Sequence, residues 1–284
     1  MSTIKAPNIT SLKSTSLLIG LFIPFSQAYA SRVETKSINI DVYVNRDGSL
    51  DIVDNRRIFF EKETTEFTYQ VPLTPASNIS DFILRQDDQL YQEIDGNQEN
   101  INSYQVLSNK NELAVEYYFW AKDQTKKFTF NYHVNGATSR YQDTALVEWF
   151  FLDKNTASIT NQININFYLP DLAESEQIQA WIRGAFDYDL NIESGQNIHF
   201  YTNQLDPKYH LQAKVTFPSS FILGDIIPQT ILSELIEQEE NFQTEYTTQR
   251  QSQQVQQKKL KSFPDFQSQD SDTGNSAVSS DMMI

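Results

Sequence analysis

The sequence of 284 residues contains no cysteine. Disulfides, thiolate metal ligands, a thiol nucleophile and a lipid-modified cysteine are therefore excluded. Glycine is also scarce, with 8 residues, which disfavours a glycine-rich phosphate-binding loop. The chain lacks the nucleophile elbow G-x-S-x-G, a P-loop, an H-E-x-x-H motif and a dinucleotide fingerprint. No reaction class is indicated, and we expect neither catalytic residues nor a cofactor.

Basic side chains are outnumbered by acidic ones, and the formal net charge is -15. The first thirty residues hold Lys5, Lys13 and no acid, so a chain without them carries -15 - 2 = -17. This sign argues against nucleic acid and against adsorption to anionic membrane surfaces, because both need a basic face. Partners are expected to be neutral or cationic, unless the acidity only keeps an exported domain soluble.

The amino end has the parts of an export signal. Two lysines precede an apolar run at 17–25, and Ala28-Tyr29-Ala30 fits an A-x-A cleavage site. The run is about half of the roughly 20 residues that cross a bilayer core, and Pro24 interrupts its end. We predict a signal peptide over 1–30, cut after Ala30, and an exported protein that is extracellular or bound to the cell envelope. A permanent transmembrane anchor is the less favoured alternative.

From Ile38 onward, apolar residues alternate with polar ones, which places one side of a strand against a core. An Asp47-Gly48 turn then leads to Leu50, as is typical of a hairpin. Aromatics make up 13% of the chain and favour sheet. The pattern predicts an all-β fold over 31–222, an antiparallel β-sandwich that is immunoglobulin-like or related. Further strands are expected near 56–60, 66–71, 79–85, 101–107, 113–119, 128–134, 147–151, 163–169, 196–202 and 211–217.

The apolar period changes after Pro228. Residues 229–261 contain no Gly or Pro, and four apolar positions fall at helical spacing: Ile231, Leu235, Phe242 and Tyr246. Because this stripe is thin, we expect a linker and a long, mostly exposed α-helix over 223–261, with a poor seam for a coiled coil. The polar, Ser-rich tail at 262–284 is predicted to be disordered.

Histidines and carboxylates show no complete set of metal ligands. By strand parity the three histidines point away from the core: His133, His199 and His210. They also lack the spacing of a metal site. Asp187 and Asp189 could offer oxygens to one ion, and 270–274 resembles half of a calcium loop without its third ligand and distal Glu. We interpret both as solvated, so no metal site is expected.

Aromatic side chains are the remaining candidates for ligand binding. The strand around Trp149 is apolar on both faces apart from Glu148, so Trp149 is predicted to belong to the core. Trp120 is off the parity of its strand and is expected to be exposed, whereas Trp181 is ambiguous. Trp120 and Trp181 are therefore the candidates for stacking on a sugar ring or a protein partner.

Four segments occur in the order and spacing typical of one family's exported domain. They are INIDVYVNRDGSLDIVDNRRIFF, FTFNYHVNGATSRYQDTALVEWFFLD, INININFYLP and KVTFPSSFI. On these segments, residues 33–222 resemble the domain of unknown function 2207, the YciQ-like group of predicted bacterial membrane proteins. The run YQDTALVEWFF is similar to the family hallmark Y-x-D-x-A-x-L-x-W, which implies a structural role for Tyr141, Asp143 and Trp149.

Two departures limit what the resemblance implies. Gln70 stands where relatives tend to carry an arginine before the Ile/Val-Pro pair. Relatives also pass from this domain into a transmembrane helix, where this chain has a Gln-rich helix. The resemblance therefore implies an extracytoplasmic module without its usual anchor. It brings no known activity, ligand or catalytic residue.

Three hypotheses for function follow. The first is a non-enzymatic binding or scaffolding module of the bacterial cell envelope, with an envelope protein or a glycan as partner. The second is a carbohydrate-active enzyme with two carboxylates, near Glu148 or Asp187, at the separation that glycoside hydrolysis needs. The third is a truncated paralogue tethered to the membrane by an uncleaved signal segment. Membrane contact is expected only through that segment or through a partner.

Overall fold

A computed structural model describes residues 33–96, 100–107, 109–153, 159–160, 162–185, 187–193, 195–203, 205, 210–228 and 230–262. Side chains are described for these residues except at 159–160 and 253–262. The predicted signal peptide at 1–30, the stretch at 270–274 and the tail from 263 lie outside this part of the chain. The interpretations made for those segments, and the domain boundaries, stay predictions.

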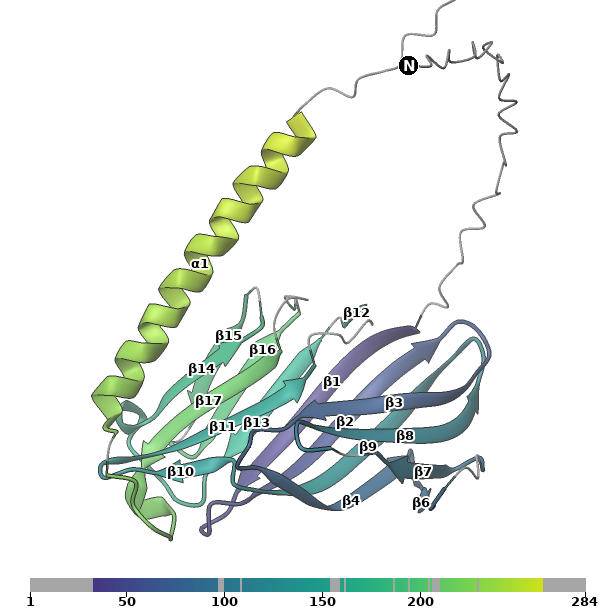
Figure 1. Ribbon diagram of the computed structural model, residues 1–284, viewed down its shortest axis with the longest axis horizontal. Helices are drawn as coiled ribbons and strands as arrows, with labels where there is room; N and C mark the ends of the chain where they lie inside the picture. The colour runs from purple at the N-terminus through teal and green to yellow at the C-terminus, as the bar shows by residue number, and fades with distance from the viewer. Residues whose placement is uncertain are drawn as a thin grey trace, which may run out of the picture. The chain divides into compact units, whose positions relative to one another are not determined.

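The described chain is mostly β-structure and forms three sheets (Figure 1). The large sheet has the spatial order β15 (Asp189–Glu193), β16 (Asn197–Thr202), β13 (Ile163–Tyr168), β1 (Val33–Val44), β2 (Leu50–Phe60), β9 (Gln124–Asn135), β4 (Asn78–Gln86), β5 (Gln89–Leu90), with β12 (Ile159–Thr160) also pairing β1. The β8 sheet has the order β3 (Thr64–Pro72), β8 (Glu112–Ala121), β7 (Ser103–Val106), β6 (Gln92–Glu93). The β17 sheet has the order β10 (Thr138–Arg140), β11 (Thr144–Leu152), β17 (Leu211–Pro218), β14 (Gln179–Arg183). Short 3₁₀ turns, η1 (Ser175–Gln177) and η2 (Ser219–Phe221), and one α-helix, α1 (Leu232–Ser262), complete the described elements.

β1 and β2 form the hairpin that the sequence predicts. Asp47 Oδ1 accepts hydrogen bonds from the backbone N and the hydroxyl of Ser49, at 2.9 and 2.6 Å. Gly48 adopts a φ of 84°, a left-handed conformation that residues with a Cβ rarely take. This turn fixes the register in which Val42 lies opposite Ile52, and both side chains point into the core.

The β8 and β17 sheets lie side by side over one face of the large sheet, which gives two layers (Figure 1). Aromatic rings join the layers. Tyr69 of β3 stacks on Phe130 of β9 with ring centroids 4.0 Å apart, and Phe151 of β11 meets Phe167 of β13 edge-on at 6.1 Å. Trp149 is fully buried, as its strand pattern predicts.

The large sheet is mixed, so the prediction of a purely antiparallel fold is wrong. β1 pairs in parallel with β13, from Ile38 opposite Ile163 to Tyr43 opposite Tyr168. A parallel pair needs a connection of a dozen or more residues, and the long chain between β1 and β13 provides it. Residue alternation carries no information on strand direction, which is why the sequence did not indicate this pairing. The immunoglobulin-like classification stays a prediction.

A charged pair lies inside the core. Asp54 and Arg56 both point inward from β2, with exposed fractions of 0% and 8%. Arg56 Nη2 donates to Asp54 Oδ2 at 2.7 Å and to the carbonyl oxygen of Phe151 at 3.4 Å. The Tyr69 hydroxyl donates to Asp54 Oδ2 at 3.1 Å, and the Arg56 guanidinium lies 4.5 Å from the Tyr69 ring centroid. The pair on the large sheet therefore contacts both smaller sheets.

The surroundings of this pair keep its charges in place. Burial by itself would lower the pKa of Arg56. The Asp54 carboxylate beside it has the opposite effect, and the pKa of Arg56 is raised overall. Burial also raises the pKa of Tyr69 and Tyr132, so both hydroxyls stay protonated. Trp149 Nε1 has no hydrogen-bond partner of ordinary geometry among the described residues. Its N–H group lies near the Tyr132 hydroxyl and partly offsets the rise in the pKa of Tyr132.

Helix α1 packs one side of its first turns on the outer face of the β17 sheet. Glu239 is only 2% exposed, accepts a hydrogen bond from Arg183 Nε at 3.1 Å and lies 2.7 Å from Lys214 Nζ. The Arg183 guanidinium also lies 3.8 Å from the ring centroid of Phe242. The long helix is confirmed, but the sequence did not indicate that an acid would be the most buried of its described side chains. Within the described chain, no helix has the length and apolar character needed to cross a membrane.

Replacing Arg56 with alanine should lower the free energy of unfolding by about 3–5 kcal/mol, because Asp54 is left as an unpaired buried carboxylate. Denaturant unfolding followed by tryptophan fluorescence measures the change. Arg57→Ala, at the exposed neighbouring position, is the matched control and should stay within about 0.5 kcal/mol of the parent. An equal loss in both variants would show that the buried pair has no special role.

Replacing Glu239 with glutamine should loosen α1 by about 1.5–3 kcal/mol, because Arg183 and Lys214 lose the anion between them. The effect should be local. Amide hydrogen exchange over 232–250 should accelerate roughly tenfold or more, following that free energy, while the amides of the large sheet keep their rates. Glu240→Gln, on the exposed side of the helix, serves as control. Unchanged exchange in α1 would contradict the docking role of Glu239.

Candidate functional site

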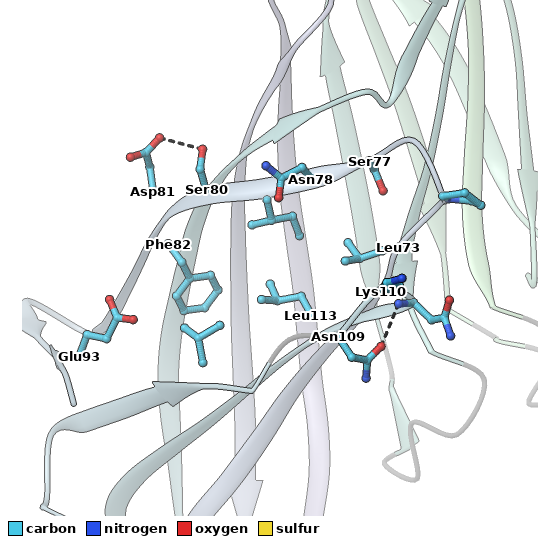
Figure 2. Close-up of a pocket in the computed structure, with 14 residues that line it drawn as sticks. Leu73, Ser77, Asn78, Ser80, Asp81, Phe82, Glu93, Asn109, Lys110 and Leu113 are labelled. Atoms are coloured by element: carbon cyan, nitrogen blue, oxygen red, sulfur yellow. Dashed lines mark hydrogen bonds between the residues drawn. The ribbon is translucent and has the colours of Figure 1, made fainter. Parts of the chain in front are cut away.

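A pocket opens between the edge of the large sheet and the edge of the β8 sheet (Figure 2). Its volume of ≈ 700 Å³ falls within the range of about 300–1,000 Å³ that is typical of small-molecule sites. Strand β4 forms one wall, and β6, β7, β8 and the loops at 73–77 and 109–111 contribute the rest. We call it the edge pocket. Its apolar lining includes Leu73, Ile79, Phe82, Val106 and Leu113, and its polar lining is Ser77, Asn78, Ser80, Asp81, Glu93, Asn109, Lys110 and Asn111.

A β-bulge in β4 shapes the first wall. The pairing with β9 shifts between Ser80 and Ile83, and Asp81 adopts a φ of 53°. Aspartate tolerates this left-handed conformation better than most residues with a side chain. The extra residue reverses the parity of the strand, so that Phe82 turns toward the interior and Asp81 remains exposed. The bulge therefore turns the Phe82 ring into the pocket, while the Asp81 side chain projects from the other side of β4 (Figure 2).

Hydrogen bonds within the loops order the opposite wall. Leu73 N donates to the carbonyl oxygen of Asn111 at 2.8 Å, which ties the end of β3 to the loop before β8. Asn109 Oδ1 accepts from Asn111 N at 2.8 Å (Figure 2). Ser77 Oγ accepts from Thr74 N at 2.9 Å. These hydrogen bonds hold the loops in shape.

Charged groups lie at opposite ends of the edge pocket. Figure 2 shows Glu93 on one side of Phe82 and Lys110 with Asn109 on the other, while the Asp81 side chain points away from Phe82. Burial, and then the charge of Glu93, raise the pKa of Tyr104 to about 12. The Tyr104 hydroxyl therefore stays protonated and donates to the carbonyl oxygen of Phe82 at 2.9 Å. The pocket has an acidic end, an apolar middle and an end rich in amides with one lysine.

A second, shallower hollow adjoins the edge pocket. It shares Leu73, Asn109 and Asn111 with the edge pocket and has a volume of ≈ 470 Å³. Its remaining lining comes from Pro72, Glu112, Phe150, Asp153 and His210. His210 Nδ1 lies 3.6 Å from Asp153 Oδ2. Of the three histidines weighed from the sequence, His210 is the one that lines either of these two hollows.

The tryptophans proposed for ligand stacking lie apart from the edge pocket. Trp120 on β8 is 47% exposed, as its parity predicts. Trp181 on β14 is half-buried and lies opposite Lys214, on the β17-sheet face to which α1 is attached. The structure therefore places them on different sheets, and neither lines the two hollows. Their role in stacking stays a prediction.

The hallmark residues of the sequence analysis contact the chain around α1 or fill the core. The Asp143 carboxylate accepts hydrogen bonds from the backbone N of Leu232, at 3.2 and 3.3 Å, where α1 begins. Tyr141 forms an isolated bridge with Ile227 in the linker. Trp149 lies in the core beside Tyr132. Asp143 is thus placed to satisfy the first helical N–H group and to favour the helix dipole.

The other polar candidates are held in separate places. Glu148 accepts from Gln212 Nε2 at 2.7 Å on the outer face of the β17 sheet, and Asp187 is exposed before β15. His133 Nδ1 lies 2.7 Å from Asp51, whose hydrogen bond raises the pKa of His133. His199 contacts Asn164 at 3.2 Å. Within the described chain, no group of three or more His, Asp or Glu side chains is placed to hold a metal ion.

None of the edge-pocket residues was singled out from the sequence. Strand β4 was expected at 79–85, but the parity of a regular strand would turn Asp81 and Ile83 inward together with Ile79. The bulge changes that parity. One signal was available: Ser80-Asp81 interrupts an otherwise apolar stretch, as a bulge or a break would.

A family model described as "Predicted membrane protein (DUF2207) N-terminal domain" matches residues 34–217. That range begins in β1 and ends in β17, so it contains all three sheets and excludes α1. No curated protein sequence matches the chain significantly.

Solved structures show weak likeness only. A protein from Legionella pneumophila, provisionally described as a nutrient binding protein, is 12% identical with a TM-score of 0.41, over 65% of this chain and 67% of that one. The M1 zinc metallopeptidase of Deinococcus radiodurans is 9% identical with a TM-score of 0.36, over 65% of this chain and 42% of its own. The chain thus spans less than half of the peptidase. Likeness at this level carries no information on activity.

The bulge gives a test of the pocket wall. Asp81→Val should lower the free energy of unfolding by about 1–2 kcal/mol, because a β-branched residue is strained in the left-handed conformation. Asp81→Asn, which tolerates that conformation, should match the parent in denaturant unfolding. Equal stability of the two variants would mean that β4 does not need the positive φ at this position.

Proposed function

Because the chain belongs to the family of predicted membrane proteins whose amino-terminal domain matches residues 34–217, we propose that it is a non-catalytic binding module of the bacterial cell envelope. Its scaffold is a two-layered sandwich of immunoglobulin-like or related type, exported across the cytoplasmic membrane. The edge pocket is its ligand site. The export signal predicted at 1–30 supports the location.

The single observation that carries this proposal is the composition of the edge pocket. Apolar side chains form its middle, and amide, hydroxyl and charged groups surround them. Preformed pockets that bind small ligands share this arrangement, in which apolar contact supplies affinity and a few polar groups supply orientation. A binding role therefore uses both the apolar middle and the polar groups around it.

The carbohydrate-active alternative receives less support. The acids named as starting points for a carboxylate pair, Glu148 and Asp187, line neither the edge pocket nor the hollow beside it. Glu148 instead contacts Gln212 and Lys214 on the face where α1 is attached. A pair of acids near either residue therefore has no cleft among the two hollows described above.

The proposal predicts saturable binding of the purified full-length chain to isolated cell envelopes, measured by co-sedimentation. Asn78→Trp, at an exposed position over the pocket, should weaken this binding at least about tenfold, because the indole fills the space that the ligand occupies. Thr68→Trp places the same side chain on an exposed position of β3 outside the pocket and should bind normally.

Two results would count against the proposal. The first is equal binding by the Asn78→Trp and Thr68→Trp variants, which would exclude the edge pocket as the site. The second is recovery of a carboxy-terminally tagged chain in the cytoplasm after cell fractionation. Amino-terminal sequencing adds a further check, since a mature chain that starts at Ser31 excludes a tether made by an uncleaved signal.

A further inference from the structure

The outer face of the large sheet carries a regular array of amide side chains. Two rows cross the central strands β13, β1, β2 and β9, and the residues of a row lie directly opposite one another. Their neighbours along each strand are core residues, so this face points away from the β8 and β17 sheets (Figure 1). One row is Asn164, Asn39, Asn55 and Thr129, and the next is Asn166, Asp41, Val53 and Asn131. We call these eight residues the amide face.

The composition of the amide face differs from that of a sheet that is merely solvated. Asparagine is disfavoured in strands, yet it fills five of the eight positions, all of them exposed or half-buried. Charged residues make up 21% of the chain and gather at surfaces, so several would be expected here, whereas Asp41 is the only one of the eight. Departures from local preference are typical of functional surfaces.

Hydrogen bonds between strands fix the orientation of these amides. Asn164 Nδ2 donates to Asn39 Oδ1 at 2.9 Å, and Thr129 Oγ1 donates to Asn55 Oδ1 at 2.8 Å. A side-chain amide has two N–H donors and an oxygen with two lone pairs, so much of this capacity stays unused. The amide nitrogens of Asn39 and Asn55, and both ends of Asn131, have no partner among the described side chains. The face therefore offers ordered donors and acceptors to a ligand.

A pair of tyrosines lies at one end of the rows. The rings of Tyr43 and Tyr168 stack with centroids 4.8 Å apart, and Tyr43 is 43% exposed. The Tyr168 hydroxyl donates to Asp41 Oδ1 at 3.3 Å, and Asn166 Nδ2 donates to the same oxygen at 2.8 Å. The one carboxylate of the face is thus held by neutral donors, and Tyr43 adds apolar ring surface beside it.

The chemistry of the amide face selects among classes of ligand. Protein interfaces have an apolar or aromatic centre, whereas Val53 is the one apolar side chain among the eight. Nucleic acid needs lysine or arginine, which these positions lack, and the net charge of -15 disfavours polyanions in general. Sugar hydroxyls both donate and accept, as amides do, and the C–H side of a sugar ring packs on an aromatic ring.

We propose that the amide face binds a neutral polysaccharide, whose chain lies along the rows across β13, β1, β2 and β9. Four strands span about 14 Å, which are three spacings of about 4.8 Å, so the face holds several linked sugars. This site is separate from the edge pocket and goes beyond the proposed function. A flat face covers one side of its ligand, so its affinity is lower than that of a pocket that encloses one.

Affinity electrophoresis measures such weak binding. The full-length chain is run in native gels that contain a mixed-linkage β-glucan, a galactomannan, soluble starch or, as the polyanionic comparison, alginate. At least one of the three neutral polymers should retard the chain relative to a reference protein, and alginate should not. No retardation by any neutral polymer, or stronger retardation by alginate, would overturn the proposal.

A double variant identifies the surface. Asn39→Thr with Asn164→Thr should raise the apparent dissociation constant about fivefold or more, because two amides are lost. Threonine suits strands better than asparagine, so stability in denaturant should be equal or higher. Asn241→Thr, on the exposed side of α1, makes the same exchange outside the face and should bind normally. Unchanged retardation of the double variant, or a loss that accompanies lower stability, would refute binding by these amides.

Two further results separate this inference from the proposed function. Asn78→Trp, which fills the edge pocket, should be retarded like the parent, and loss of its retardation would assign the polysaccharide to the pocket instead. The double variant should still sediment with cell envelopes in the pocket-dependent way described above. Size-exclusion chromatography adds a check on the occupant. A dimer of the parent chain that the double variant does not form would show that a second copy, and not a polysaccharide, covers the face.

Discussion

The buried pair of Asp54 and Arg56 is the interaction on which the arrangement of the three sheets depends. Apolar contact between layers is non-directional, so by itself it fixes the position of a small sheet on a large one only loosely. The charged pair is directional, because its hydrogen bonds need defined angles. Asp54 accepts a hydrogen bond from the Tyr69 hydroxyl of the β8 sheet, and Arg56 donates one to the Phe151 carbonyl of the β17 sheet. Well-packed apolar residues often match a buried ion pair in stability. Its contribution is therefore best understood as positioning.

That positioning reaches the edge pocket through a stack of rings. The Tyr69 and Tyr132 hydroxyl oxygens lie 3.2 Å apart, and the Tyr132 ring lies nearly parallel to the ring of Phe82 with centroids 6.3 Å apart. Phe82 is thus the last member of a series that begins at the ion pair. Packed rings thus support the wall formed by β4, whereas the wall at 109–111 is held by hydrogen bonds within its loop and to the ends of β3 and β8.

The sequence predicts those features that depend on neighbours in the chain. The hairpin of β1 and β2, the burial of Trp149 and the existence of α1 follow from alternation, turn residues and helical spacing. The sequence also predicts the inward orientation of Asp54 and Arg56, because they continue the alternation of Leu50 and Ile52. A pattern made of apolar residues alone does not include them. Glu239 could not be placed, since Arg183 and Lys214 are distant in the sequence. The bulge at Asp81 depends on one backbone angle, and with it the whole edge pocket was missed.

The position of β1 has a consequence for the newly made chain. It is the first described strand, yet it lies in the middle of the large sheet, between β2 and β13. Synthesis delivers β1 early, whereas residues 163–168, which cover its second edge, come after the midpoint of the chain. During that interval an apolar strand exposes a row of backbone groups to which another copy can attach. Chaperones that keep nascent chains apart would therefore matter more for this protein than for one whose first strand ends up at a sheet border.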